Sequence, residues 1–208
     1  MHFLITSGPT REPIDAVRFI SNRSSGKMGM AIARAAAEAG HEVTCLMGPG
    51  TAEPPTSAKI FRFESCSDLN RLLEEHFPDC DVLVMAAAVS DYQPTETIDG
   101  KMPRESQPEV QLQLRSTPDL VTRMVARKRP HQRVIAFALE EDNQLDRRAR
   151  EKLQRKGADA IVANPLSTMD DEMVTPRWIT AAGDHESPGR LSKSEFGHWL
   201  IDRCTGSA

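Results

Sequence analysis

The chain has 208 residues and a slightly negative charge, with 26 Lys and Arg against 30 Asp and Glu. This length fits one domain, 1–208, with a substantial core, and the lack of a basic excess argues against a nucleic-acid partner. No segment has the ~20 apolar residues of a membrane span or the pattern of a signal peptide, so we expect a cytoplasmic protein that binds no membrane.

The four cysteines, at positions 45, 66, 80 and 204, form no CxxC pair. In a chain without an export signal, such cysteines are typical of buried thiols. The six histidines show no metal-binding spacing either. The sequence therefore predicts no metal site made by protein side chains.

Apolar runs alternate with helical segments along the chain. Strands are expected at 2–6, 41–47, 59–63, 81–88, 134–138, 160–164 and 177–181, and as a half-buried strand of alternating Val110, Leu112 and Leu114. Helices are expected at 26–39, at 67–77 capped by Ser67, from Ser116-Thr117-Pro118-Asp119 with Pro118 in the first turn, at 143–156 and at 192–204. This alternation predicts an α/β fold, a Rossmann-like three-layer sandwich with a mostly parallel sheet.

The stretch 21–29 ends a long loop and opens the first helix. Ser24 or Ser25 can cap that helix, and Gly26 and Gly29 leave room for a close neighbour. The free N–H groups and the dipole at a helix N-terminus favour an anion. A capped helix packed on the sheet without any ligand explains the same residues, so this stretch alone leaves both interpretations open.

Four loops follow predicted strands, at 8–25, 86–94, 137–142 and 163–164. Ligands bind beyond the carboxyl ends of strands in open parallel sheets, so we expect these loops to meet at one crevice. The polar stretch 93–108 has no core pattern and is expected to move as a flap. The Walker A, GxGxxG and GxSxG motifs are absent, which weakens the usual hydrolase and oxidoreductase interpretations.

Longer blocks resemble phosphopantothenoylcysteine synthetase, the family that makes the second intermediate of coenzyme A biosynthesis. They are GPTREPID at 8–15, RFISN at 18–22, SSGKMG at 24–29 and AAAVSDY at 86–92, and further matches at 117–119 and within 152–164 extend the resemblance to about residue 165. In many bacteria this synthetase is fused behind a flavin-dependent decarboxylase. The chain starts at the synthetase blocks, so the resemblance implies no flavin here and a possible separate decarboxylase partner.

The resemblance implies a ligase that works in two half-reactions. CTP or ATP, with Mg²⁺, activates the carboxylate of 4'-phosphopantothenate as an acyl-nucleotide and releases pyrophosphate. The amine of L-cysteine then forms the amide and releases the nucleoside monophosphate. Members of the family are homodimers in which the partner chain helps to complete the pantothenate pocket.

The resemblance also assigns roles to residues of this sequence. Asn22, which can hold the acyl carbonyl, and Lys101, on the flap, match catalytic positions. Arg18, Asn22 and Ala87 match substrate-binding positions. The implied nucleotide-binding residues are Gly8, Ser24, Ser25, Gly26, Ala87, Asp91, Phe137, Lys152 and Lys156.

Three segments depart from the family pattern. The flap has Lys101-Met102-Pro103-Arg104 in place of Lys-x-Lys-Lys, and 136–141 and 169–174 also differ. The choice between CTP and ATP stays open. The alternatives are a nucleotide-dependent reductase, whose usual motifs are missing, and a non-catalytic nucleotide-binding or regulatory module. The altered flap favours such a module, whereas Asn22 and Lys101 argue against it.

Overall fold

The computed structural model describes residues 1–103, 109–169 and 171–206. Its helices are α1 (Lys27–Glu38), α2 (Cys66–His76), α3 (Leu120–Arg127), α4 (Leu145–Lys156) and α5 (Lys193–Thr205), with short 3-10 turns η1 (Phe77–Asp79), η2 (Asp142–Gln144) and η3 (Leu166–Thr168). Its strands are β1 (His2–Ser7), β2 (Arg11–Pro13), β3 (Phe19–Ser21), β4 (Glu42–Met47), β5 (Lys59–Arg62), β6 (Val82–Met85), β7 (Tyr92–Pro94), β8 (Leu114–Ser116), β9 (Arg133–Glu140), β10 (Ala160–Pro165), β11 (Met173–Val174), β12 (Arg177–Thr180), β13 (His185–Glu186) and β14 (Leu191–Ser192).

One sheet of eight strands organises the chain, in the order β13-β12-β10-β9-β6-β1-β4-β5. The strands from β10 to β5 are parallel, and β12 and β13 extend the sheet in the antiparallel sense. Numbered along the chain, the parallel strands lie in the dinucleotide-fold order 3-2-1-4-5-6, which changes direction between β1 and β6. The predicted α/β sandwich with a mostly parallel sheet is therefore confirmed.

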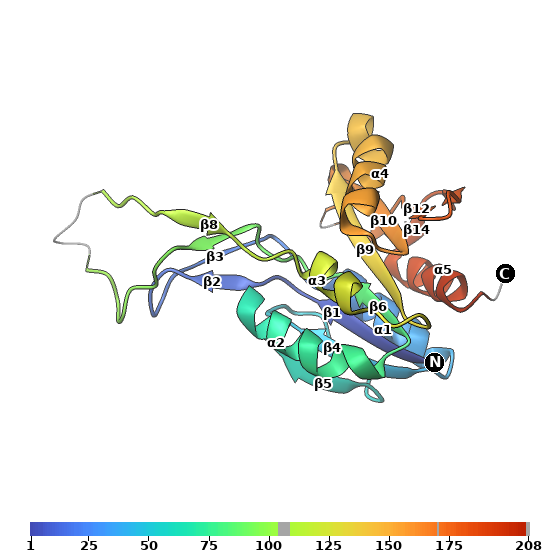
Figure 1. Cartoon of the computed structure of the whole chain (residues 1–208), viewed down its shortest axis with the longest axis horizontal. Helices are drawn as coiled ribbons and strands as arrows, with labels where there is room; N and C mark the ends of the chain where they lie inside the picture. The colour runs from blue at the N-terminus through green and yellow to red at the C-terminus, as the bar shows by residue number, and fades with distance from the viewer. Residues whose placement is uncertain (104–108, 170, 207–208) are drawn as a thin grey trace.

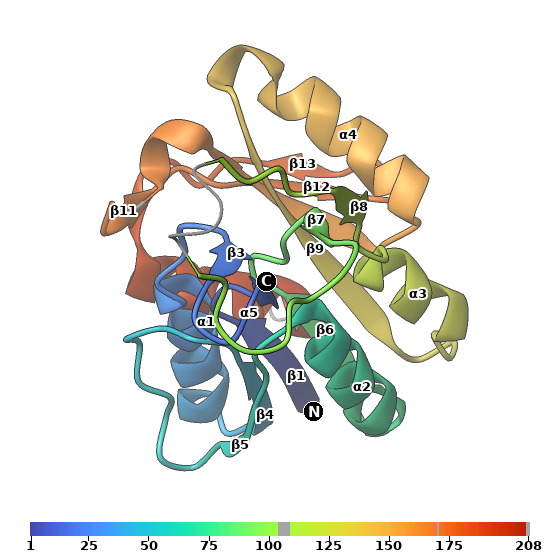
Figure 2. The ribbon, with the colours of Figure 1, turned by 90° about the vertical axis from the view of Figure 1, so that its left-hand side faces the viewer.

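Helices cover both faces of this sheet (Figure 2). The residues of α2, α3 and α4 form one apolar cluster with one face, through Leu73, Met124 and Leu153. The residues of α1 and α5 form the second cluster with the other face, through Ile32 and Leu200. The two apolar clusters hold the sheet rigidly between the helices. The loops of the predicted crevice therefore begin from a fixed edge of the sheet.

An arm leaves the body of the molecule at that edge (Figure 1). We use "arm" for residues 11–21 and the described parts of 92–116, which contain the antiparallel pairs β2–β3 and β7–β8. The two parts are joined by backbone hydrogen bonds, 2.9 Å from the Ile98 amide to the Ile14 carbonyl and 3.0 Å from the Ala16 amide to the Gly100 carbonyl. The flap predicted at 93–108 thus lies along the arm, and its residues 104–108, including Arg104, lie outside the described residues.

Several local predictions are wrong. Val110, Leu112 and Leu114 are exposed, not half-buried, because this segment runs along the arm rather than against the core, and only 114–116 pairs as β8. The cap of α2 is Ser65, not Ser67, because only Ser65 stands three residues before Asp68 and forms a capping box with it. Pro118 lies outside the first turn of α3, contrary to the prediction, because the cap residue is Asp119 and the helix begins at Leu120.

The cysteines are free and buried, as predicted. Burial raises the pKa of the Cys45, Cys80 and Cys204 thiols to about 12, so these thiols stay protonated and unreactive at neutral pH. Among the described residues, no helix is long and apolar enough to cross a membrane.

Candidate functional site

The loops after β1 and β6 meet where the strand order changes direction. The Ala88 amide donates to the Gly8 carbonyl at 3.0 Å, and the Thr10 amide donates to the Ala88 carbonyl at 3.2 Å. The hydroxyl of Thr10 accepts from the Ser90 amide at 3.0 Å. These bonds hold the two loops together as one wall beyond the carboxyl edge of the sheet.

The N-terminus of α1 opens onto this wall. The cap residue itself is Gly26, with φ 77°, and not Ser24 or Ser25. The two serines still accept from the first amides of this turn, Ser24 Oγ from the Gly26 amide at 3.4 Å and Ser25 Oγ from the Lys27 amide at 3.5 Å, so the prediction holds only in this weaker form. The left-handed backbone turns the chain here, and the Ser7 hydroxyl donates to the Gly26 carbonyl at 2.8 Å. One turn on, a Cβ at Gly29 would lie 2.6 Å from Cβ of Ser7, so α1 can approach β1 this closely only with glycine.

A cavity of about 1310 Å³ lies between these loops, α1, α3 and α4. Its walls come from all four loops that the sequence predicts to converge, so the single crevice is confirmed. The predicted site residues that line it are Asn22, Ser24, Ser25, Gly26, Ala87, Asp91, Phe137, Lys152 and Lys156.

The other three predicted site residues lie outside this lining. Gly8 stands behind it, against the backbone of Gly48 and Pro49. Arg18 lies on the arm and pairs with Asp15 at 2.8 Å. Lys101 is exposed on the same arm. A single chain therefore brings together the predicted nucleotide positions except Gly8, but not the predicted flap lysine or the predicted substrate-binding arginine.

Positive charge is concentrated around the cavity, although the whole chain is negative. Its lining holds eight Lys and Arg side chains, namely Arg23, Lys27, Arg147, Arg148, Lys152, Arg155, Lys156 and Lys193. The acidic residues of the lining are Asp91, Asp119, Glu140 and Glu151. This excess of cations, next to a helix N-terminus, favours a polyanion over a neutral ligand.

Two lysines of α4 differ in their surroundings. The ammonium of Lys156 is paired at 2.7 Å with Asp119, and the side chain of Lys156 is 13% exposed. Lys152 has no hydrogen bond or ion pair within the described part of the chain, and burial, with Lys156 nearby, lowers its pKa. An incompletely neutralised and partly desolvated cation gains most when an anion binds beside it.

Asn22 links the loop after β1 to the loop after β6, at the place where the strand order changes direction. Its Nδ2 donates to the carbonyls of Ala88 at 3.3 Å and Val89 at 3.0 Å. Both N–H groups of the amide are thereby directed at the turn after β6, and its oxygen is the group left to face a ligand. To donate to the carbonyl of a ligand, the Asn22 amide would have to give up its bond to Ala88 or to Val89.

The sequence of this chain matches the profile of a family described as DNA/pantothenate metabolism flavoprotein, C-terminal domain, over residues 1–206. The chain belongs to this family. The coenzyme A biosynthesis bifunctional protein CoaBC of Mycobacterium tuberculosis is 41% identical over 176 residues, which are 78% of this chain and 41% of that protein. A protein of an unknown prokaryotic organism, named cysteine/cysteine sulfinic acid decarboxylase, is 43% identical over 163 residues, 78% of this chain and 45% of that protein.

Solved structures of the family have the same fold. The C-terminal domain of a coenzyme A biosynthesis bifunctional protein superposes with a TM-score of 0.83 at 32% identity, over 98% of this chain and 93% of that one. The DNA/pantothenate metabolism flavoprotein from Streptococcus pneumoniae superposes with a TM-score of 0.87 at 26% identity over both whole chains. The resemblance to the synthetase domain is therefore confirmed. The chain spans less than half the length of the curated relatives it matches.

Part of the cationic lining, including Arg148 and Arg155, was not among the residues predicted from the sequence. Arg148, Lys152 and Arg155 are spaced by four and three residues and all line the cavity, so they share one face of α4. That spacing was available from the sequence. Lys193 and Asn164 also line the cavity, but only the pairing of β10 beside β9 and the position of α5 bring them there.

The segment that departs from the family pattern at 169–174 lies against α1. Lys27, the first residue of α1, forms an ion pair with Glu172. Lys193 donates to the Asp171 carbonyl. Residue 170 of this segment lies outside the described residues. The segment that departs from the family pattern thus pairs the Glu172 carboxylate with Lys27, one of the cations that line the cavity.

Within the described residues, no group of three or more His, Cys, Asp or Glu side chains could hold a metal ion. Mg²⁺ in proteins often uses only one or two carboxylates and takes its other ligands from phosphates and water. Asp91 lines the same cavity as the lysines of α4 and has the carboxylate for such a role. The residues present fit an ion that arrives with a triphosphate.

Proposed function

We propose that this chain is a phosphopantothenate–cysteine ligase. It joins 4'-phosphopantothenate to L-cysteine through an acyl-nucleotide formed from CTP or ATP. The observation that carries this proposal is the excess of cations around one cavity that also contains Asn22 and the N-terminus of α1. A reaction that brings a carboxylate to a triphosphate needs such charge, because both reactants are anions.

In the first half-reaction, the carboxylate oxygen attacks the α-phosphorus of the triphosphate. A new P–O bond forms, the bond to the β-phosphate oxygen breaks, and pyrophosphate leaves. Lys152 and Lys156 would neutralise the phosphates from α4, and the N-terminus of α1 would bind a second anionic group. Mg²⁺, held by the phosphates and by Asp91, would add charge neutralisation at the leaving group.

In the second half-reaction, the free amine of cysteine attacks the acyl carbonyl. The C–N bond forms, the C–O bond to the nucleotide breaks, the nucleoside monophosphate leaves and the amine gives up a proton. The negative charge on the carbonyl oxygen needs a nearby donor or cation. Asn22 would supply this donor after releasing one of its two bonds to the turn that follows β6.

The half-reactions can be separated with Asn22→Asp. The variant keeps the shape of the side chain but adds a carboxylate next to the developing oxyanion, so the second step should slow more than the first. We expect acyl-nucleotide to accumulate and to be detected by mass spectrometry after an acid quench. Asn143→Asp, an exposed change on η2 outside the cavity, is the matched control. If Asn22→Asp forms the amide at the rate of the control variant, Asn22 takes no part in the second step.

We also propose a homodimer formed through the arm. The arm exposes apolar side chains, with Val17 60%, Phe19 45%, Ile98 41% and Leu114 45% exposed. Several exposed apolar side chains on one projecting segment favour an interface, and a second copy would bring Arg18 and Lys101 to a cavity they do not line in their own chain. Phe19→Asp with Leu114→Asp should give monomers in sedimentation velocity. Leu166→Asp, on an exposed leucine of the body, should leave a dimer. A wild-type monomer would contradict the proposal.

Two other functions have weaker support. A regulatory module would bind a triphosphate without turnover, and a reductase would need a nicotinamide cofactor whose motifs are absent. The experiment that separates them incubates wild type with CTP or ATP, Mg²⁺, phosphopantothenate and cysteine, and follows the amide by mass spectrometry. Amide formation supports the ligase. Tight binding of triphosphate without any amide would favour the regulatory module.

A further inference from the structure

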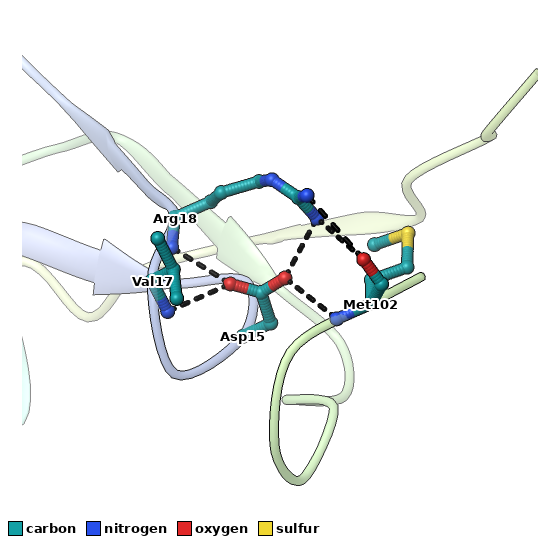
Figure 3. A network of polar contacts seen from close by, with 4 residues as sticks. All are labelled: Asp15, Val17, Arg18 and Met102. Carbon is teal, nitrogen blue, oxygen red and sulfur yellow. Dashed lines mark hydrogen bonds and ion pairs between the residues drawn. The ribbon is translucent and has the colours of Figure 1, made fainter. Parts of the chain in front are cut away.

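The carboxylate of Asp15 lies at the centre of a closed polar network on the arm (Figure 3). Its side chain is fully buried. Oδ1 accepts from the amides of Val17 at 2.8 Å and Arg18 at 2.7 Å. Oδ2 accepts from Nη1 of Arg18 at 2.8 Å and from the amide of Met102 at 3.1 Å.

This network crosses between two segments far apart in the sequence. Both terminal nitrogens of Arg18 also donate to the Met102 carbonyl, at 3.4 and 3.3 Å. The neighbouring backbone bond from Ala16 to Gly100 measures 3.0 Å. Lys101 therefore has both its neighbours tied to the turn at 14–18, and its own backbone position follows from that turn.

The network needs a carboxylate rather than any polar group. Each of the four atoms that contact Asp15 is a donor, and only an ionised carboxylate offers acceptors at both oxygens. The amide of Val17 contributes most to lowering the pKa of Asp15, and the amides of Met102 and Arg18 add to it against the opposing effect of burial. Asp15 is thus ionised at neutral pH, as the geometry requires.

We propose that Asp15 is a positioning residue that couples Arg18 and Lys101 into one rigid unit at the tip of the arm. This inference rests on the proposed ligase function, in which the two cations meet the two anionic reactants. With Asp15 in place, the Arg18 guanidinium and the backbone that carries Lys101 are held against one another. Without it, each cation samples many positions, and little of their charge is preorganised for the transition state.

Asp15→Asn is the sharpest test, because it divides the network. An asparagine oxygen can still accept from the amides of Val17 and Arg18 and so keep the turn. Its NH₂ group would face the Met102 amide and the Arg18 guanidinium, so donors would meet donors on the flap side. The matched control is Asp99→Asn, which removes the same charge from an exposed position on the same arm.

Two readouts separate positioning from a merely structural role. In wild type, the Met102 amide should exchange slowly with deuterium; in Asp15→Asn it should exchange at least tenfold faster, and in Asp99→Asn at the wild-type rate. Pyrophosphate release should slow about tenfold in Asp15→Asn but change less than about twofold when Asp15→Asn is added to Lys101→Gln, because residues acting through one another are not additive. The coupling should appear in kcat for pyrophosphate release rather than in the melting temperature.

Three outcomes would overturn the proposal. They are unchanged exchange of the Met102 amide in Asp15→Asn, fully additive losses in the double variant, and equal losses in Asp15→Asn and Asp99→Asn. If the wild type forms no amide, the proposed function fails by itself. In that case the exchange of the Met102 amide still decides whether Asp15 fixes the flap.

Discussion

Lys156 on α4 and Asp119 at the cap of α3 form an ion pair of 2.7 Å across the rim of the cavity. Burial alone would raise the pKa of Asp119, but its bonds to Lys156 and to the Thr122 amide outweigh this, so its pKa lies below its ordinary value. The pair keeps the Lys156 ammonium directed at the rim, and α3 supplies the partner. The position of this positive charge at the rim of the cavity thus depends on a contact between two helices and not on the loops.

The first prediction concerns this lysine. Lys156→Met should raise the KM for triphosphate about tenfold, because it removes one charge-assisted contact to phosphate. Folding should change little, since Asp119 keeps its cap bond of 3.2 Å to the Thr122 amide. Arg150→Met, on α4 but outside the cavity lining, is the control. Equal KM values for the two variants would show that Lys156 does not contact the triphosphate.

The second prediction is a pH dependence that comes from Lys152. Burial lowers the pKa of Lys152, so as the pH rises this site loses a positive charge earlier than an ordinary lysine would. The value of kcat/KM for triphosphate should therefore fall on the alkaline side. Lys152→Arg stays charged and should move that fall to higher pH, whereas Lys128→Arg, outside the cavity, should not. An unchanged profile in Lys152→Arg would contradict the assignment.

The third prediction concerns the packing of α1 on β1. Alanine favours a helix over glycine by roughly 0.5–1 kcal/mol, yet Gly29→Ala should destabilise the protein by about 2 kcal/mol, because overpacking outweighs propensity. The added Cβ would lie 2.6 Å from Cβ of Ser7. Thermal unfolding followed by circular dichroism measures the change. A higher melting temperature would show that β1 and α1 can separate at little cost.

The fourth prediction concerns the carboxylate that this chain places beside Lys27. Glu172→Gln should lower the KM for triphosphate about twofold, because an exposed pair contributes little and Lys27 becomes available to phosphate. Glu75→Gln, on α2 away from the cavity, should have no effect. A rise in KM would mean that Glu172 shapes the site instead of competing for it.

Much of the fold follows from the sequence, because buried strands such as 160–164 have continuous apolar runs and helices such as 143–156 end at a glycine. The arm does not. β2 and β3 are three residues each, too short for periodicity, and Val110, Leu112 and Leu114 alternate as a core strand would while lying exposed. The contact between Asp15 and Met102 could not be predicted from the sequence for the same reason. Met102 is distant from Asp15 in the sequence, and only the fold of the arm brings the two residues close.

The measurement that tests the ligase account most directly is a rapid quench of wild-type protein with triphosphate, Mg²⁺ and phosphopantothenate, but without cysteine. We expect a burst of pyrophosphate close to one equivalent per active site, with an equal amount of acyl-nucleotide that is converted to amide when cysteine is added. Absence of pyrophosphate with both CTP and ATP, or steady release without any acyl-nucleotide, would contradict it.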